Sequence, residues 1–273
     1  MQQDGSKRLL DDYHEASWSP LGRFVVAARE NELAALEPDG GVRWTLSRPG
    51  VESPRWTGSK TDTRIAYVDR TGIRIVAGDG SGDRLFVPGG RSPIAWRPGS
   101  PFELAYVDLR GRVALLDTAS GSTVWRGRRD GRIVDLEWST DGRRLVATSR
   151  RARDDIGVYT ARGALYTGFR LNRGAVSSSA VRPGSHDQAV AIVVRGQSRL
   201  LLPHVRGATL SGPGTLENIA WAPDARWLVV AWPGADQFVF VRADGTRIRA
   251  VSNVSEQFRS RSFPRIEGWC CAD

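Results

Sequence analysis

The sequence has few lysines, cysteines, methionines and histidines, and it has no long hydrophobic run. No stretch approaches the ~20 apolar residues of a membrane-spanning helix, so this chain is predicted to contain no span. The two cysteines, Cys270 and Cys271, are adjacent, which strains a bond between them, and no second Cys or His group completes a zinc site. We interpret both as unpaired thiols, with an intermolecular bridge, or a link to something missing from this chain, as the alternative.

Motifs for common enzyme chemistries are also missing. The three histidines, His14, His186 and His204, lie far apart in the sequence. There is no Gly-x-Ser-x-Gly elbow and no phosphate loop with Gly-Lys-Ser/Thr, which excludes those hydrolase and nucleotide-binding sites. The segment 79–83 has a loose likeness to a calcium loop, but its position predicts a hairpin turn. We therefore expect no catalytic residue, no cofactor and no metal.

Lysine is scarce because arginine supplies almost all of the positive charge. The net charge is +9, and only Lys7 and Lys60 of the 39 basic residues are lysines. A nucleic-acid site needs its arginines on one face, whereas these are scattered through every segment. We interpret the excess as coding bias and expect no nucleic-acid partner; a polyanion surface is the alternative. The densest runs form a candidate basic rim of Arg126, Arg128, Arg129, Arg150, Arg151 and Arg153.

A repeat of about 40 residues runs through all 273 residues. Its anchor is a tryptophan, replaced once by valine, and successive anchors are 38 to 48 residues apart. A period near 40 is typical of β-propeller blades, each a four-stranded sheet. The anchors are Trp18, Trp56, Trp96, Trp138, Val181, Trp221 and Trp269. We interpret them as packing anchors of the blades rather than as a ligand platform.

The contents of each period repeat as well. A turn follows most anchors, then come two β-branched or aromatic runs, a Gly-bearing hairpin turn and a fourth run. This predicts an all-β propeller with six full blades, forming a single domain over residues 1–273. Segments 7–10 and 265–269 are predicted as strands of a partial seventh blade built from both termini, which would remove an exposed edge. We expect that the chain begins inside a blade, either as a truncated version of a longer protein or because Met1 is an internal start.

The turns after the anchors carry a family resemblance. Segments 18–22, 138–142 and 221–225 are variants of the Trp-Ser-Pro-Asp-Gly segment that opens each blade in TolB-like bacterial propellers, which are related to WD-repeat proteins. The chain resembles that class over about residues 6 to 271, and the fifth blade departs from it through Val181.

The two ends of the chain carry a second resemblance. They are similar to a group of actinobacterial propellers of undefined function that follow a basic segment and one membrane helix. The resemblance implies an extracytoplasmic propeller, anchored in the full-length form by a segment upstream of this chain. Without such an anchor, a cytoplasmic location is the alternative.

Polar residues beside the anchors are the remaining candidates for a site. The first strand of a propeller blade lines the central channel, so these side chains are predicted at its mouth. We interpret them as a hydrated lining, with a ligand or cation site as the alternative. The candidates are Glu15, Asp135, Glu137, Asn218 and Glu267.

The fold itself suggests what the chain does. A rigid propeller with exposed loops is a platform for peptides or protein domains. We therefore predict a monomeric, non-enzymatic interaction or scaffold module with a protein partner, at the bacterial cell envelope. The alternative is a small-ligand or cation sensor, or a hydrolase-type enzyme, that uses the channel mouth.

Overall fold

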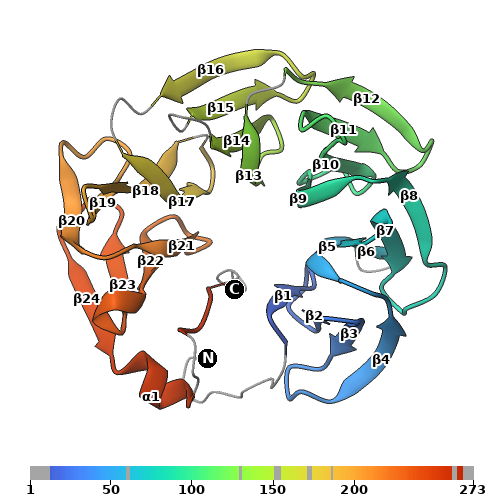
Figure 1. Ribbon diagram of the computed structural model, residues 1–273, viewed down its shortest axis with the longest axis horizontal. Helices are drawn as coiled ribbons and strands as arrows, with labels where there is room; N and C mark the ends of the chain where they lie inside the picture. The colour runs from blue at the N-terminus through green and yellow to red at the C-terminus, as the bar shows by residue number, and fades with distance from the viewer. Residues whose placement is uncertain are drawn as a thin grey trace. The chain divides into compact units, whose positions relative to one another are not determined.

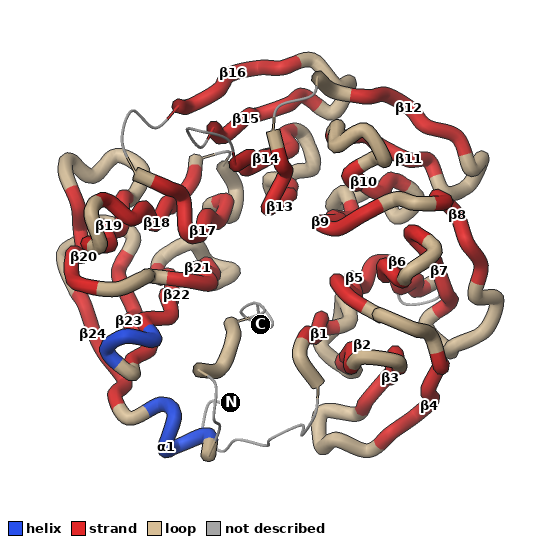
Figure 2. The backbone as a smooth tube through the Cα atoms, viewed as in Figure 1, coloured by secondary structure: helices blue, strands red, loops and turns tan. Residues whose placement is uncertain are grey.

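The computed structural model describes residues 13–59, 62–128, 131–150, 155–170, 174–185, 187–259 and 263–266. The chain divides into two compact units, one of residues 1–110 with 114–124 and the other of residues 111–113 with 125–273. In both units the described residues are mainly strands and turns (Figure 2). The strands form six four-stranded sheets, as many as the full blades predicted from the repeat.

In every blade the strands follow one another in chain order and pair antiparallel (Figure 1). Short turns make this possible, because an antiparallel pair needs only a tight hairpin between its strands. The first three blades contain β1 (Glu15–Trp18), β2 (Val25–Arg29), β3 (Glu32–Leu36), β4 (Val42–Ser47), β5 (Glu52–Gly58), β6 (Thr63–Asp69), β7 (Gly72–Ala77), β8 (Arg84–Pro88), β9 (Arg91–Trp96), β10 (Glu103–Val107), β11 (Val113–Asp117) and β12 (Ser122–Arg126).

The other three blades repeat the pattern. They contain β13 (Arg132–Trp138), β14 (Arg144–Arg150), β15 (Asp155–Thr160), β16 (Leu165–Arg170), β17 (Ala175–Val181), β18 (Gln188–Val194), β19 (Gln197–Leu201), β20 (Ala208–Pro213), β21 (Glu217–Trp221), β22 (Trp227–Trp232), β23 (Gln237–Arg242) and β24 (Ile248–Ser252). A short 3-10 turn, η1 (Pro233–Ala235), joins β22 to β23, and one helical turn, α1 (Val254–Phe258), follows β24.

Burial follows the order of the strands within a blade. The second strands are almost fully buried, as in β2 and β14, because both of their faces are covered. The fourth strands β4, β8, β12, β20 and β24 contain half-buried and exposed positions, so they form the outer edge of each sheet. This explains why the middle runs of each repeat are continuous apolar segments while the fourth runs alternate.

The hydrophobic core lies between successive blades. One cluster joins Val26 and Leu33 of the first blade to Ile65 and Tyr67 of the second. Another joins Ala180 and the fully buried Leu200 of the fifth blade to residues of the sixth, including Leu228. Within each unit, neighbouring blades therefore stabilise one another, and a single sheet does not bury both of its faces by itself.

The anchors end or nearly end the first strand of each blade. Trp96, Trp138 and Trp221 are buried, and Val181, which replaces tryptophan, is buried as well. Beside this valine, the indole Nε1 of Trp221 donates to the carbonyl oxygen of Ala180, at 3.1 Å, as Trp96 does to the carbonyl oxygen of Arg55. Trp18 departs from the prediction, since 40% of its surface is exposed.

The C-terminal segment after β24 packs against the sixth blade. Phe258 at the end of α1 and Phe263 pack against Phe238 with edge-on ring contacts, at centroid distances of 6.2 and 5.2 Å. Residues 263–266 form no strand, so the strand predicted at 265–269 is wrong for its first two residues. Packing of Phe263 and Ile266 against the sixth blade replaces strand pairing there. The rest of that segment, and the strand predicted at 7–10, lie outside the described residues.

Candidate functional site

Side chains near the anchors connect the first strands of successive blades. In one unit, the Ser17 hydroxyl accepts a hydrogen bond from the amide of Trp56 at 3.3 Å. In the other, a carboxyl oxygen of Glu137 accepts a hydrogen bond from the amide of Val181 at 2.7 Å. Ser17 and Glu137 each stand one residue before their own anchor, and each bonds to the next anchor. We call this arrangement the blade junction.

A second row of bonds lies three residues before the anchors. Glu15 accepts a hydrogen bond from the amide of Ser53, and the Ser178 hydroxyl accepts one from the amide of Ile219 at 3.0 Å. Both rows join the first and second blades, whereas the first row joins the fourth and fifth blades and the second row joins the fifth and sixth. Predicted channel residues therefore have a structural role, whether or not they also bind a ligand.

The junction between the fourth and fifth blades contains a pair of carboxyl groups. Asp135 accepts a hydrogen bond from Ser179 at 3.4 Å, and the hydroxyls of Ser179 and Thr148 lie 3.0 Å apart. Although part of the Glu137 residue is exposed, burial of its carboxyl group is the main reason why its pKa rises to about 8. The negative charge of Asp135 raises the pKa further, and the Val181 amide opposes the rise. Near neutral pH, Glu137 is therefore mainly protonated.

The other predicted channel residues are distributed differently. Glu15 belongs to the first unit, and Asp135, Glu137 and Asn218 belong to the second. The structure brings Asp135 and Glu137 together at one junction. Asn218 is half-buried in β21, with a left-handed φ of 47°. Glu267 lies outside the described residues, and a ligand site formed by the whole set stays a prediction.

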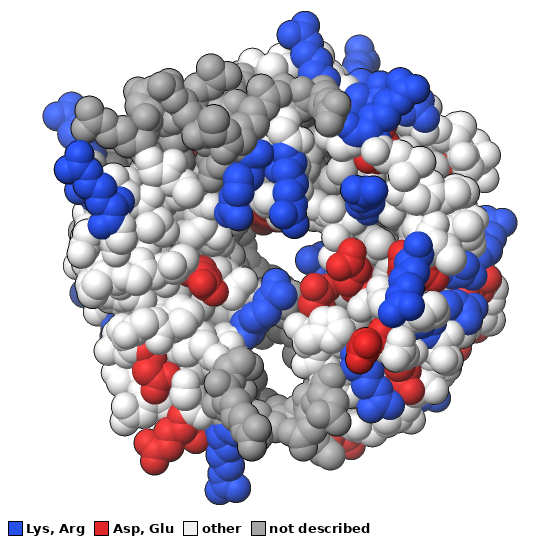
Figure 3. Space-filling model, viewed as in Figure 1, with Lys and Arg blue, Asp and Glu red and all other residues white. Residues whose placement is uncertain are grey.

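Half of the predicted basic rim can be described. Arg126, Arg128 and Arg150 are exposed, whereas Arg129, Arg151 and Arg153 lie outside the described residues. Arg150 uses one guanidinium nitrogen to donate to the carbonyl oxygen of Val176 at 3.1 Å, so it also connects two blades. On the face shown in Figure 3, acidic side chains are interspersed with basic ones over the first two blades.

The segment 79–83 forms a turn. Asp79 accepts hydrogen bonds from the amide and the hydroxyl of Ser81, at 2.9 and 2.7 Å. Asp83 is held by Arg48, Arg74 and Tyr67. Burial raises the pKa of Asp83, but these three hydrogen bonds outweigh it and leave the pKa below its usual value. The carboxylate oxygens of Asp79 therefore belong to a turn, and those of Asp83 belong to an ion-pair cluster.

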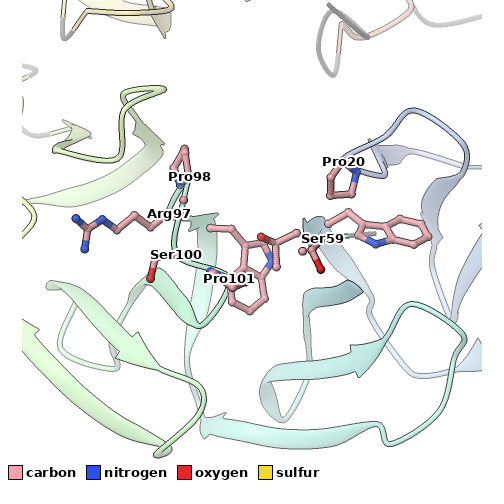
Figure 4. A pocket seen from close by; sticks show the side chains of 11 residues that line it. Pro20, Ser59, Arg97, Pro98, Ser100 and Pro101 are labelled. Atoms are coloured by element: carbon pink, nitrogen blue, oxygen red, sulfur yellow. The ribbon is translucent and has the colours of Figure 1, made fainter. Parts of the chain in front are cut away.

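A recess opens where the first strands of three successive blades turn into the second strands. Its volume is about 420 Å³. Pro20 and Pro98 stand on opposite sides of it, with Ser59 and Pro101 between them (Figure 4). We call this recess the turn-edge groove, and its lining consists of Pro20, Trp56, Thr57, Gly58, Ser59, Trp96, Arg97, Pro98, Gly99, Ser100 and Pro101.

The groove coincides with a departure from the repeat. The second residue after the anchor is proline in the first and third blades, Pro20 and Pro98, but it is Gly58 in the second. Gly58 has a φ of +124°, and a Cβ there would lie 2.1 Å from the carbonyl oxygen of Asp62. A side chain is therefore excluded at this position, and the second blade lacks the ring that its neighbours carry.

The lining of the groove is mostly apolar and nearly neutral. Its one charged residue, Arg97, pairs with Glu103 at 2.6 Å, and in Figure 4 the Arg97 side chain extends away from Pro20 and Ser59. The indole Nε1 of Trp56 is buried and has no hydrogen-bond partner among the described residues, whereas Trp96 donates to the carbonyl oxygen of Arg55 at 3.0 Å. The groove therefore offers apolar contact rather than charge.

A second recess, of about 440 Å³, lies between turns of the fifth and sixth blades and is charged. Its Arg242 pairs with Asp244 at 3.1 Å, and Arg226 lies 4.0 Å from Asp224. His204, also in its wall, contacts Asp187 at 3.0 Å. Most charged side chains of this recess are thus close to a side chain of opposite charge.

Known proteins identify the fold. No family model and no curated protein matches the sequence. The β-propeller domain of Cps50 (Swd1) from Myceliophteria thermophila is similar in structure, with a TM-score of 0.69 at 9% identity, over 91% of this chain and 89% of that one. The fold is a β-propeller. Hydrazine synthase from Kuenenia stuttgartiensis is similar as well, with a TM-score of 0.66 at 14% identity, over 96% of this chain and 83% of that one.

These similarities show the propeller fold and do not transfer a function, because the sequence identities are low. The count of six sheets fits the predicted six blades plus a partial seventh. Within the described ranges, no helix is long and apolar enough to cross a bilayer. Nor does any group of three or more His, Cys, Asp or Glu side chains in those ranges have the geometry to hold a metal ion.

The turn-edge groove is a functional candidate that the repeat pattern does not predict. The prolines after the anchors are typical turn residues, and as such they indicate no recess. The exchange of proline for Gly58 between two proline-bearing repeats was the available signal. That the three turns enclose a recess depends on the packing of neighbouring blades, which the repeat pattern does not specify.

Proposed function

We propose that this propeller is a non-enzymatic protein-interaction module, and that the turn-edge groove holds a peptide segment of its partner. The observation that carries the proposal is the groove itself, an apolar recess with no uncompensated charge in its lining. Its volume falls within the range usual for ligand sites. Apolar recesses with a few polar groups at the margin are typical of binding sites rather than of acid–base catalysis.

The position of the groove supports the same function. It is built from turns, and turns on a rigid framework are frequent binding elements. The framework is held by the bond between Ser17 and Trp56 and by the bond between Trp96 and Arg55, which join the same three blades. A preformed groove loses little entropy on binding, so that even a modest contact area can give measurable affinity.

Selection from a displayed random-peptide library tests this function. The immobilised full chain is compared with Pro98→Glu, which places a charge at the wall of the groove. The matched control is Pro223→Glu, because Pro223 is exposed at the equivalent turn of the sixth blade and lies outside both recesses. We expect enriched peptides that bind the wild type and Pro223→Glu but not Pro98→Glu. No enrichment over the Pro98→Glu protein would contradict the proposal.

We further propose that the module works at the bacterial cell envelope. The support is the resemblance of its anchor turns, such as 18–22, to those of TolB-like propellers, and of its two ends, 12–18 and 268–271, to those of the anchored actinobacterial group. Fractionation of cells that express the tagged full-length gene, followed by protease treatment of intact spheroplasts, tests the location. Digestion without lysis is the expected result, and protection until lysis would contradict it.

A second candidate function is the sensing of a small ligand or cation at Asp135 and Glu137. The raised pKa of Glu137 favours it, because a group that holds a proton at neutral pH can exchange that proton for a cation. Calcium titration in weak buffer at pH 7 tests it through proton release. Release by the wild type but not by Glu137→Gln supports this function, and equal release by both contradicts it.

A further inference from the structure

We infer that the recess between the fifth and sixth blades binds a short aliphatic carboxylate, such as a glutamate side chain, through Arg182. We call this recess, which has a volume of about 440 Å³, the charged recess. The inference goes beyond the proposed function, because the charged recess and the turn-edge groove belong to different units and share no residue. The evidence comes from two repeats that carry arginine at the same position.

Arginine follows the anchor in the third and fifth blades, as Arg97 and Arg182. In both blades the amide of this arginine donates to the carbonyl oxygen of the residue opposite, Glu103 at 2.9 Å and Asp187 at 2.8 Å. The Glu103 carboxylate also pairs with the Arg97 guanidinium, at 2.6 Å. The side chain of Asp187 is shorter, and its carboxylate contacts the His204 ring at 3.0 Å. The fifth blade therefore lacks the ion pair of the third.

The Arg182 guanidinium has donors to offer to a ligand. Its Cζ lies 5.8 Å from the centroid of the buried Trp221 ring, and within the described part of the chain it has no hydrogen bond and no ion pair. A ring contact of this kind positions the cation but does not satisfy its N–H groups. Arg182 is half-buried and lines the charged recess, so a carboxylate in the recess can accept hydrogen bonds from these groups.

The rest of the wall favours a single negative charge on a short aliphatic stem. The wall contains three arginines and two aspartates, and Arg226 and Arg242 each have an aspartate nearby, so one positive charge remains. A monocarboxylate balances this charge, whereas a phosphate dianion would also be repelled by the two aspartates. Proline, valine and alanine side chains of the wall can contact the stem. Glutamate, the residue that pairs with Arg97 in the third blade, has this chemistry, and so does a free short-chain acid.

Titration of the full chain, followed by NMR of its backbone amides, tests the inference with two carboxylate probes. The peptide acetyl-Gly-Glu-Gly-amide represents a protein partner, and propionate represents a free acid. The uncharged control is acetyl-Gly-Gln-Gly-amide. We expect saturable binding of the glutamate peptide, with an affinity about tenfold or more above that of the glutamine peptide. Equal affinity for propionate would assign the site to free acids, and weaker binding of propionate would assign it to a protein partner.

Two variants test the role of Arg182. In Arg182→Gln the affinity for the glutamate peptide should fall by about tenfold or more. In Arg182→Lys, which keeps a cation beside Trp221 but loses the planar fork of donors, it should fall by less. The matched control is Arg199→Gln, because Arg199 is exposed on β19 outside the charged recess and its loss changes the net charge equally. We expect Arg199→Gln to bind the peptide as the wild type does.

Three results would overturn the inference. The first is equal affinity for the glutamate and glutamine peptides, or no saturation by either carboxylate probe. The second is an affinity that Arg182→Lys leaves unchanged, or that Arg182→Gln and Arg199→Gln reduce equally, which would indicate a general effect of net charge. The third is tighter binding of inorganic phosphate than of either carboxylate probe. None of these results bears on the turn-edge groove, which the random-peptide selection tests separately.

Discussion

Ser17 and Glu137 occupy the same place in two repeats and do so with different chemistry. Each side chain accepts a hydrogen bond from the amide of the next anchor, Trp56 in one case and Val181 in the other. The serine is neutral at every ordinary pH. The glutamic acid is neutral only while it keeps its proton. Since burial raises its pKa to about 8, it loses that proton within the ordinary pH range. The hydrogen bond at a blade junction can thus be insensitive or sensitive to pH, depending on which residue precedes the anchor.

The largest expected effect is the change of the free energy of unfolding with pH. The pKa of Glu137 is higher in the folded chain than its ordinary value of 4.5, so its contribution to stability is fully present below pH 4.5. That contribution falls as the pH rises and is lost once the pH passes about 8. The loss amounts to roughly 5 kcal/mol for a shift of this size. Urea unfolding from pH 4 to 9 measures it.

Glu137→Gln is the control for that measurement. The amide keeps an acceptor for Val181 but does not titrate. We expect the pH dependence of its free energy of unfolding to be nearly flat over the same window. A wild-type protein and a Glu137→Gln variant with the same slope would show that Glu137 is not the group responsible.

The second prediction concerns variants that remove the hydrogen bond at each of the two blade junctions separately. Glu137→Ala leaves the buried amide of Val181 without an acceptor, and the free energy of unfolding at pH 5 should fall by about 2 kcal/mol. Ser17→Ala should cost about 1 kcal/mol, since its bond is longer. Hydrogen exchange of the Val181 and Trp56 amides separates the effects, because each variant should expose only its own amide. Exposure of both amides by either variant would show that the joints are not independent.

The third prediction removes the charge beside Glu137. In Asp135→Asn the coulombic contribution to the pKa of Glu137 disappears, so the pKa should drop below its present value while burial keeps it above 4.5. The change in stability near pH 8 should be about 1 kcal/mol in favour of the variant. Titration of the side-chain carboxyl by NMR measures it. An unchanged midpoint would mean that Asp135 does not contribute to the pKa of Glu137.

The smallest effect is expected from Ser179→Ala. Ser179 bonds to Asp135 at 3.4 Å and lies 3.0 Å from the Thr148 hydroxyl, so its loss should reduce the free energy of unfolding by about 0.5–1 kcal/mol. Ser211→Ala on the exposed strand β20 is the matched control and should change it by less than about 0.5 kcal/mol. Equal effects in the two variants would assign no structural role to Ser179.

Much of the fold could be predicted because it is periodic. The anchors fall 38 to 48 residues apart, and each one stands in the first strand of a four-stranded sheet. Alternation and turn residues are local signals, and a repeated local signal is hard to misread. The strand predicted at 265–269 failed in its described part because the sequence does not show that Phe263 and Ile266 find an apolar surface on the sixth blade.

The candidate site could be predicted less well. Asp135 and Glu137 were recognisable as polar residues beside an anchor. Their use as acceptors depends on which residue of the next strand lies opposite, and that register is a property of the packed blades. The same holds for Arg48, whose pairing with Asp83 joins residues that no sequence pattern connects.

The blade junction also bears on how such a chain can evolve. In the first and fourth repeats the side chain before the anchor bonds to the backbone amide of the next anchor, so these repeats carry an acceptor for their successor as well as their own anchor amide as a donor. The donor belongs to the main chain and survives any change of side chain other than one to proline. A duplicated copy of the first or fourth repeat would therefore carry both the acceptor and the donor of such a bond. Single exchanges such as serine for glutamic acid could then give individual joints properties of their own without altering the repeat.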